Sequence, residues 1–164
     1  QAMSDSGASL ALSSEVEDLD ETEDYTGETK TVLVEQRIKQ AFFRRAVLSS
    51  YRGRCCMTGL SESRLLMASH IVPWSKDKAN RLNPRNGLCL SAIHDKAFDK
   101  GLIALTDDLR IIVSSELKQR DETFVKEVIL SMDGRAIERP ERFVPSYEFI
   151  ARHRSEVFVD SLTR

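Results

Sequence analysis

The sequence has only three cysteines, three histidines and one tryptophan, and it contains no long hydrophobic run. A transmembrane helix needs about 18 or more consecutive apolar residues, so we expect no membrane span. The N-terminus shows neither the basic region nor the apolar stretch of a secretory signal peptide. Cys55 and Cys56 are adjacent and Cys89 stands alone. Because this odd number does not suit a secreted disulfide framework, we expect a protein of the reducing cytoplasm.

Basic residues are absent from positions 1–29, where nine acidic residues lie. Positions 30–164 hold the other 17 acidic residues and all 24 Lys and Arg residues, a net charge of +7. We interpret residues 1–29 as an acidic, flexible arm or linker. A basic domain over residues 30–164 suits a polyanionic partner. The acidic arm either serves only as a linker or competes with that polyanion for the basic surface, and the composition leaves both open.

The periodicity of residues 30–164 predicts an α+β domain. A helix is expected over residues 31–50, with an apolar face formed by Val34, Ile38, Ala41, Phe42, Val47 and Leu48. The motifs "RLLMASHIV" and "GLCLSA" predict two short strands, separated by a long polar loop. "IHDKAFDK" predicts a short helix that ends at Gly101. A hairpin follows in "LIALTDDLRIIVS", and two more helices are expected within about residues 121–160.

Three polar residues occupy the junctions of the strand–loop–strand–helix unit. His70 ends the first strand, Asn86 opens the second, and His94 begins the helix. If the strands pair antiparallel, the end of the first lies beside the start of the second. The helix can then fold back over both strands and bring His94 near His70. A histidine among apolar residues is either a structural core side chain or a functional base, and the spacing alone allows both.

The combined stretch "YRGRCCMTG … LLMASHIVPWS … RLNPRNGLCLSAIHDKAFDKGLIAL" resembles the HNH nucleases, through its "HIVPW" and "H-x-x-x-F-D-x-G" motifs. The resemblance covers about residues 33–115. It implies a ββα-metal nuclease core at about residues 51–115, flanked by helices and a β-hairpin. It also implies hydrolysis of DNA phosphodiester bonds with one divalent metal ion, for which Mg²⁺ is the first expectation and Mn²⁺, Ni²⁺ and Zn²⁺ are the alternatives.

The same resemblance implies roles for individual residues. His70 matches the general base, His94 the metal ligand, and Asn86 the residue that orients the active-site loop. Histidine suits the base because its pKa lies near neutrality. The Asn86 side chain can hold the backbone or the ring of the base by hydrogen bonds, or bind the metal through its carbonyl oxygen.

Many HNH nucleases place a metal ligand directly before the base, where this chain has Ser69. Asp99 is the candidate for the missing ligand. It follows His94 by five residues, which places it about 140° away around an ideal helix. It therefore serves as a ligand only if the helix unwinds early, and it is a structural acid otherwise.

Four basic residues of the polar loop predict contacts with DNA phosphates, and a solvated surface is the alternative. They are Lys76, Lys78, Arg81 and Arg85. The three cysteines, Trp74 and Phe98 are expected in the core, and His153 is expected on the surface of a helix.

These interpretations predict the cleavage domain of a restriction or defence protein, with an upstream domain that reads the DNA and with a homodimer as a further option. Two other classes stay open. One is a DNA-binding module that keeps the fold without cutting, which Ser69 favours. The other is a dimerisation domain that uses the acidic arm as a partner segment.

Overall fold

The computed structural model describes residues 27–160, and side chains from residue 30 onward. The chain divides into two compact units, residues 1–41 and residues 42–164, which are described separately. The predicted acidic arm lies mostly outside the described residues. Residues 27–29, which were assigned to that arm, belong to a helix.

The first helix, α2 (Gly27–Ser50), confirms the helix predicted over residues 31–50 and begins four residues earlier. Its last turns belong to the second unit. There Phe43 and Val47 are buried, whereas Phe42 is exposed. The prediction is therefore confirmed for Val47 and wrong for Phe42, because Phe42 and Phe43 are adjacent and only tertiary packing selects between them.

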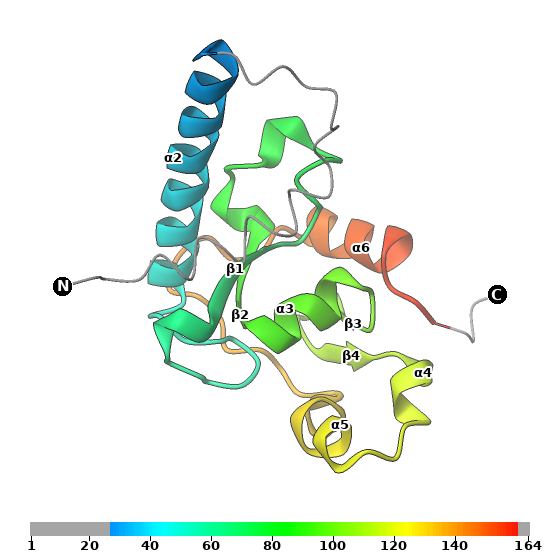
Figure 1. Ribbon diagram of the computed structural model, residues 1–164. Coiled ribbons are helices and arrows are strands. Elements are labelled where there is room, and N and C mark those ends of the chain that lie inside the picture. Colours follow the sequence, from blue (N-terminus) through cyan, green and yellow to red (C-terminus); the bar gives the residue numbers. More distant parts are fainter. Residues whose placement is uncertain (1–26, 161–164) are drawn as a thin grey trace. The chain divides into compact units, whose positions relative to one another are not determined.

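Two antiparallel strands form the centre of the fold (Figure 1). Strand β1 (Leu66–His70) pairs with β2 (Gly87–Ser91), so that His70 lies opposite Gly87. This register confirms the predicted antiparallel pairing. Gly87 has no room for a side chain, because a Cβ atom there would lie 2.9 Å from Phe43 Cζ and overlap Val47. The absence of a side chain lets α2 pack directly on the start of β2.

The loop between these strands contains two short 3₁₀ helices, η2 (Lys78–Asn80) and η3 (Pro84–Asn86). Another 3₁₀ turn, η1 (Ser63–Leu65), precedes β1. Helix α3 (Ala92–Asp99) begins directly after β2 and packs against both strands. Ser91 caps the helix, since its hydroxyl accepts the backbone N–H of His94 at 3.1 Å. Gly101 ends it at a φ of +72°, a conformation that favours glycine. The predicted strand–strand–helix unit is confirmed.

The predicted hairpin is present as β3 (Ile103–Leu105) and β4 (Ile111–Val113), which pair antiparallel. A short helix that the sequence did not predict, α4 (Ser115–Lys118), follows β4. The two expected C-terminal helices are α5 (Thr123–Val128), continued by the 3₁₀ turn η4 (Leu130–Met132), and α6 (Tyr147–Glu156). Helix α6 packs on β3.

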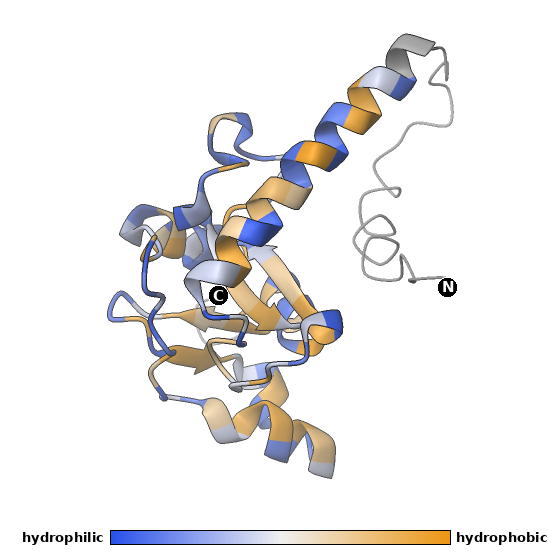
Figure 2. Cartoon of the chain, turned by 90° about the vertical axis from the view of Figure 1, so that its left-hand side faces the viewer, coloured by the Kyte–Doolittle hydropathy of each residue, from blue (hydrophilic) through white to orange (hydrophobic). Residues whose placement is uncertain are grey.

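The core of the second unit lies between both hairpins, α3 and the end of α2. Figure 2 shows the strands mostly in the hydrophobic colour. Cys55, Cys56, Cys89 and Phe98 are buried in this core, and the three thiols are free. Burial is the main reason that the pKa of Cys89 is raised to about 12, so the thiol stays protonated and acts as an apolar side chain. Within the described part of the chain, no helix is long and apolar enough to cross a membrane.

Candidate active site

The ring of His70 is fixed on three sides at the end of β1. It stacks on Phe43 with ring centres 4.1 Å apart and meets the edge of Trp74 at 5.5 Å. Its Nε2 atom lies 2.8 Å from the carbonyl oxygen of Arg81. A carbonyl only accepts hydrogen bonds, so Nε2 must carry the proton and donate it. In the neutral ring, Nδ1 is then the basic atom.

The pKa of His70 is lowered, chiefly because burial disfavours the charged ring. The hydrogen bond to the Arg81 carbonyl acts in the opposite direction, and the charge of Arg81 lowers the pKa further. The neutral form is therefore favoured near pH 7. A half-buried imidazole held in one tautomer and kept neutral has the properties of a general base.

Asn86 is fully buried and holds the loop that follows β1. Its Oδ1 accepts the backbone N–H of Val72 at 2.8 Å, and its Nδ2 donates to the Val72 carbonyl at 3.1 Å. The carbonyl of Asn86 itself accepts the N–H of Ile71 at 2.9 Å. Both Oδ1 and Nδ2 of the side-chain amide are thus hydrogen-bonded to the backbone of Val72, two residues after His70. This arrangement fits the orienting role rather than metal binding.

The ring of His94 is bonded to Ser91 and Val128 and not to His70. Its Nδ1 lies 2.6 Å from the hydroxyl of Ser91, and its Nε2 lies 2.9 Å from the carbonyl oxygen of Val128 at the end of α5. The ring is buried, and burial is the main reason that its pKa is lowered. Since both ring nitrogens are hydrogen-bonded within the protein, neither is available to a metal ion in this arrangement.

The acid that faces β1 is Asp95, a residue that the sequence reasoning missed. Its carboxylate accepts a hydrogen bond from the side chain of Ser69, the buried residue directly before His70. Burial raises the pKa of Asp95, and the negative charge of Asp99 adds to that rise. Asp95 and Asp99 are four residues apart on α3, so they share one helix face. The sequence signal for this pair was the four-residue spacing of Asp95 and Asp99. His94 and Asp99 are five residues apart and therefore do not share a helix face.

This donor set fits a hard divalent cation. Carboxylates are the ligands that Mg²⁺ prefers, and Mg²⁺ is usually held by one or two of them while it keeps several waters. Among residues 30–160, no group of three or more His, Cys, Asp and Glu side chains is placed to hold a metal ion. Asp95 is a half-buried carboxylate next to a second negative charge, and a bound cation would relieve that repulsion.

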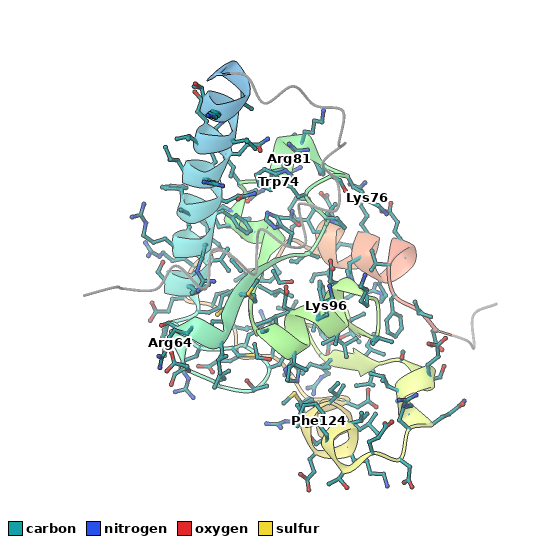
Figure 3. All side chains as sticks on the ribbon, in the orientation of Figure 1. Arg64, Trp74, Lys76, Arg81, Lys96 and Phe124 are labelled. Atoms are coloured by element: carbon teal, nitrogen blue, oxygen red, sulfur yellow. The ribbon has the colours of Figure 1, made fainter. Side chains whose placement is uncertain are left out.

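The four loop residues predicted to contact DNA have different surroundings. Lys76 and Lys78 are exposed, and Lys76 Nζ lies 3.9 Å from a carboxylate oxygen of Glu156. Arg81 stacks over Trp74 at 4.8 Å and donates to the Trp74 carbonyl at 2.7 Å. Arg85 is exposed and donates to a backbone carbonyl at 3.1 Å. Figure 3 shows Trp74 and Arg81 side by side in this loop.

The prediction that His153 lies on the surface of a helix is wrong. His153 is buried, and its ring stacks on Phe98 with centres 3.7 Å apart. Its Nε2 donates to the Phe98 carbonyl at 2.9 Å, which attaches α6 to the end of α3. The neighbouring charged residues Arg152 and Arg154 led to the prediction of an exposed His153, but they lie on other faces of the helix. Trp74, expected in the core, is half-buried.

Comparison with known proteins adds two findings. Residues 55–106 match the family model described as HNH endonuclease. Among solved structures, the chain is similar to a modification-dependent TagI restriction endonuclease, at 20% sequence identity and a TM-score of 0.53. This likeness covers 70% of the present chain and 37% of the TagI chain, so the present chain spans little more than a third of that protein. A search of curated proteins finds no match.

The matched segment includes β1, β2 and α3 and therefore contains His70, Asn86 and Asp95. The structural likeness independently supports the mixed α+β fold around these residues. Residues 55–106 are thus similar to the HNH endonucleases, a family of DNA phosphodiesterases.

Proposed function

We propose that this domain cuts DNA by metal-dependent hydrolysis with His70 as the general base. The observation that carries the proposal is the 2.8 Å contact of His70 Nε2 with the Arg81 carbonyl. It fixes the proton on Nε2 and leaves Nδ1 as the basic atom. The lowered pKa keeps that atom unprotonated near neutrality.

In the proposed reaction, His70 Nδ1 takes a proton from water while the water oxygen bonds to phosphorus. The bond between phosphorus and the 3′ oxygen breaks, and the 3′ oxygen leaves and takes up a proton. One strand then ends in a 5′-phosphate and a 3′-hydroxyl. Asn86 keeps the loop after β1 in place, so the Arg81 carbonyl stays against His70.

Asp95 and Asp99 are the proposed holders of the metal ion, in place of the His94 that the resemblance implied. When bound, a divalent ion supplies positive charge for the phosphoryl oxygen and the leaving oxygen. Two carboxylates favour Mg²⁺ or Mn²⁺, whereas Zn²⁺ and Ni²⁺ bind more readily to imidazole ligands. His94 takes a structural role between α3 and the end of α5.

Lys76, Lys78, Arg81 and Arg85 lie in the loop after the base, where phosphates of the bound strand would pass. We assign the two exposed lysines to direct phosphate contacts. The two arginines also shape the loop through their bonds to backbone carbonyls. The likeness to a restriction endonuclease supports a role as the cleavage domain of a restriction or defence protein that carries a DNA-reading domain elsewhere.

A plasmid-nicking assay with Mg²⁺ and with EDTA tests the proposal. Conversion of supercoiled to nicked or linear plasmid with Mg²⁺, and none with EDTA, is expected. The competing function is a DNA-binding module without cleavage, which the hydroxyl at Ser69 favours because a stronger metal ligand is expected there. DNA binding without nicking, under any of Mg²⁺, Mn²⁺, Ni²⁺ or Zn²⁺, would select that alternative.

A further inference from the structure

Three of the hydrogen bonds that hold the chain between η4 and α6, drawn in orange in Figure 1, attach it to the core near the proposed active site. Each attachment is a backbone hydrogen bond from this segment to residues near β1, β2 or the end of α2. The bonds run from Glu138 to the Cys56 carbonyl at 2.8 Å, from Glu141 to the Ser50 carbonyl at 2.8 Å, and from Ser146 to the Arg85 carbonyl at 3.1 Å. The segment is therefore held in a defined place, although it has no regular secondary structure.

Between Glu141 and the first residue of α6, Tyr147, the chain exposes aromatic and basic side chains together. Phe143 is 36% exposed and Tyr147 is 60% exposed, and Arg142 is exposed beside them. Exposed aromatic side chains are costly to leave in water, and a cluster of them marks an interaction surface. Their combination with arginine matches the chemistry that binds nucleic acid strands.

Phe143 has a φ of +58°, in the left-handed region that bulky residues avoid. Glycine or asparagine adopts this conformation at a lower cost in stability than phenylalanine does. Backbone strain of this kind is found where a side chain is needed for function. The attachments on both sides of Phe143 hold this strained conformation.

The segment offers unpaired arginines that can bind phosphates. The carboxylate of Glu141 is occupied by Arg52, whose Nε lies 2.6 Å away. Arg139 and Arg142 are exposed and form no ion pair with any described residue. Glu138 and Glu148 are exposed as well, so the surface that remains available is aromatic and carries charges of both signs, with Arg142 directly beside Phe143.

This surface is continuous with the proposed active site. Arg85 belongs to the loop that follows the base, and its guanidinium donates to the Val144 carbonyl at 3.1 Å, next to Phe143. Its backbone carbonyl accepts from Ser146 in return. Arg85 directly precedes Asn86, which holds the loop at Val72. A strand bound along the loop would meet Phe143 without leaving the protein surface.

We infer that Arg142, Phe143 and Tyr147 form an accessory DNA-binding surface that grips a strand with unpaired bases. Arg142 binds a phosphate, and the two aromatic rings stack on bases that are not paired. The inference rests on the proposed function, because it extends the same DNA path. It assigns the enzyme a preference for DNA that is single-stranded or locally opened beside the cut.

Binding in EDTA tests the inference apart from cleavage. Fluorescence anisotropy compares three labelled DNAs: a single strand, a duplex with a short unpaired bulge, and a fully paired duplex. For the single strand and the bulge, Phe143→Ala and Tyr147→Ala should each weaken binding by about 5- to 100-fold, the usual weight of stacking on one base. For the paired duplex, affinity should stay near that of the wild type. Arg142→Ala should weaken binding to all three DNAs and lower the salt slope by about one.

The matched control is Phe124→Ala, because Phe124 is also an exposed phenylalanine, 54% exposed, but lies on α5. Figure 3 shows it far from Trp74 and Arg81. Phe143→Gly separates function from folding: it should melt at a higher temperature than Phe143→Ala while binding the unpaired DNAs as weakly. The inference is overturned if both aromatic variants bind all three DNAs like the wild type, or if Phe124→Ala weakens binding as much. Nicking by the wild type combined with that result would leave the proposed function intact.

Discussion

The Nε2 atom of His70 donates to the carbonyl oxygen of Arg81 across a distance of 2.8 Å, so the position of a loop residue decides which nitrogen of the base is free. The two residues are 11 positions apart, and Asn86 keeps the loop between them closed by its two bonds to Val72. The fold therefore holds the proposed base in one tautomer before any substrate binds.

The lowered pKa of His70 gives a pH dependence with a definite sign. The neutral ring is the active form, and burial keeps it neutral below its ordinary pKa of about 6.5. We expect kcat/KM for DNA cleavage to rise with pH along an acid limb centred below 6.5 and then to level off. A pH profile at constant ionic strength measures it. An acid limb centred above 6.5 would contradict the assignment of the base.

Replacement of Asn86 by Ala should unfold the loop locally and destabilise the domain. The N–H and C=O groups of Val72, a buried residue, would lose their partners, and each costs about 1–3 kcal/mol. We expect the free energy of unfolding to fall by about 2 kcal/mol or more, with a loss of cleavage. Urea denaturation measures the first effect. Asn83→Ala is the control, since Asn83 is half-buried in the same loop and its side chain bonds only to the Arg85 N–H and to the Asn80 side chain. An equally large loss of stability in Asn83→Ala would contradict a special role of Asn86.

Substitutions in the acid pair, Asp95 and Asp99, and at His94 should have different effects on metal binding. Asp95→Asn removes one of two carboxylates and should weaken Mn²⁺ or Mg²⁺ binding by on the order of tenfold or more. His94→Gln should lower the melting temperature, because the buried bonds to Ser91 and Val128 are lost, but leave metal affinity unchanged. Calorimetric titration of the metal alone measures both. If His94→Gln loses the metal and Asp95→Asn keeps it, the assignment made from the resemblance is right and ours is wrong.

The salt dependence of DNA binding should identify which loop residues touch phosphates. Lys76→Ala and Lys78→Ala should each lower the slope of log affinity against log salt by about one. Arg81→Ala should in addition lower the melting temperature, because Arg81 holds the Trp74 carbonyl. If the slope is unchanged in both lysine variants, these lysines do not contact phosphates and the DNA binds elsewhere.

Much of the ββα core could be predicted because its signals are local. The strands around His70 and Asn86 are short apolar runs, and their antiparallel pairing placed the two residues at one end of the hairpin. The direction of side chains on α3 could not be predicted in the same way. A shift of one residue turns a side chain by about 100° around a helix, so a motif that contains both His94 and Asp95 does not tell which faces β1.

Long-range contacts settle that choice. His94 is held by Val128, 34 residues away, and His153 by Phe98, 55 residues away. No periodicity in the sequence reports such partners. The helix pair Asp95 and Asp99 was visible as an i, i+4 spacing, but only the contact of Asp95 with Ser69 shows that this face is turned to the strand that carries His70.

The central claim is that His70 is the general base of a metal-dependent DNA hydrolase, and the rate of plasmid nicking by His70→Ala in Mg²⁺ tests it most directly. The account predicts a rate lower by about 10²- to 10⁴-fold, the usual contribution of general-base catalysis. Metal affinity should be retained, because the ring contacts Phe43, Trp74 and Arg81 rather than the acid pair. Nicking by the variant within a few-fold of the wild-type rate, with the same dependence on pH, would contradict the account.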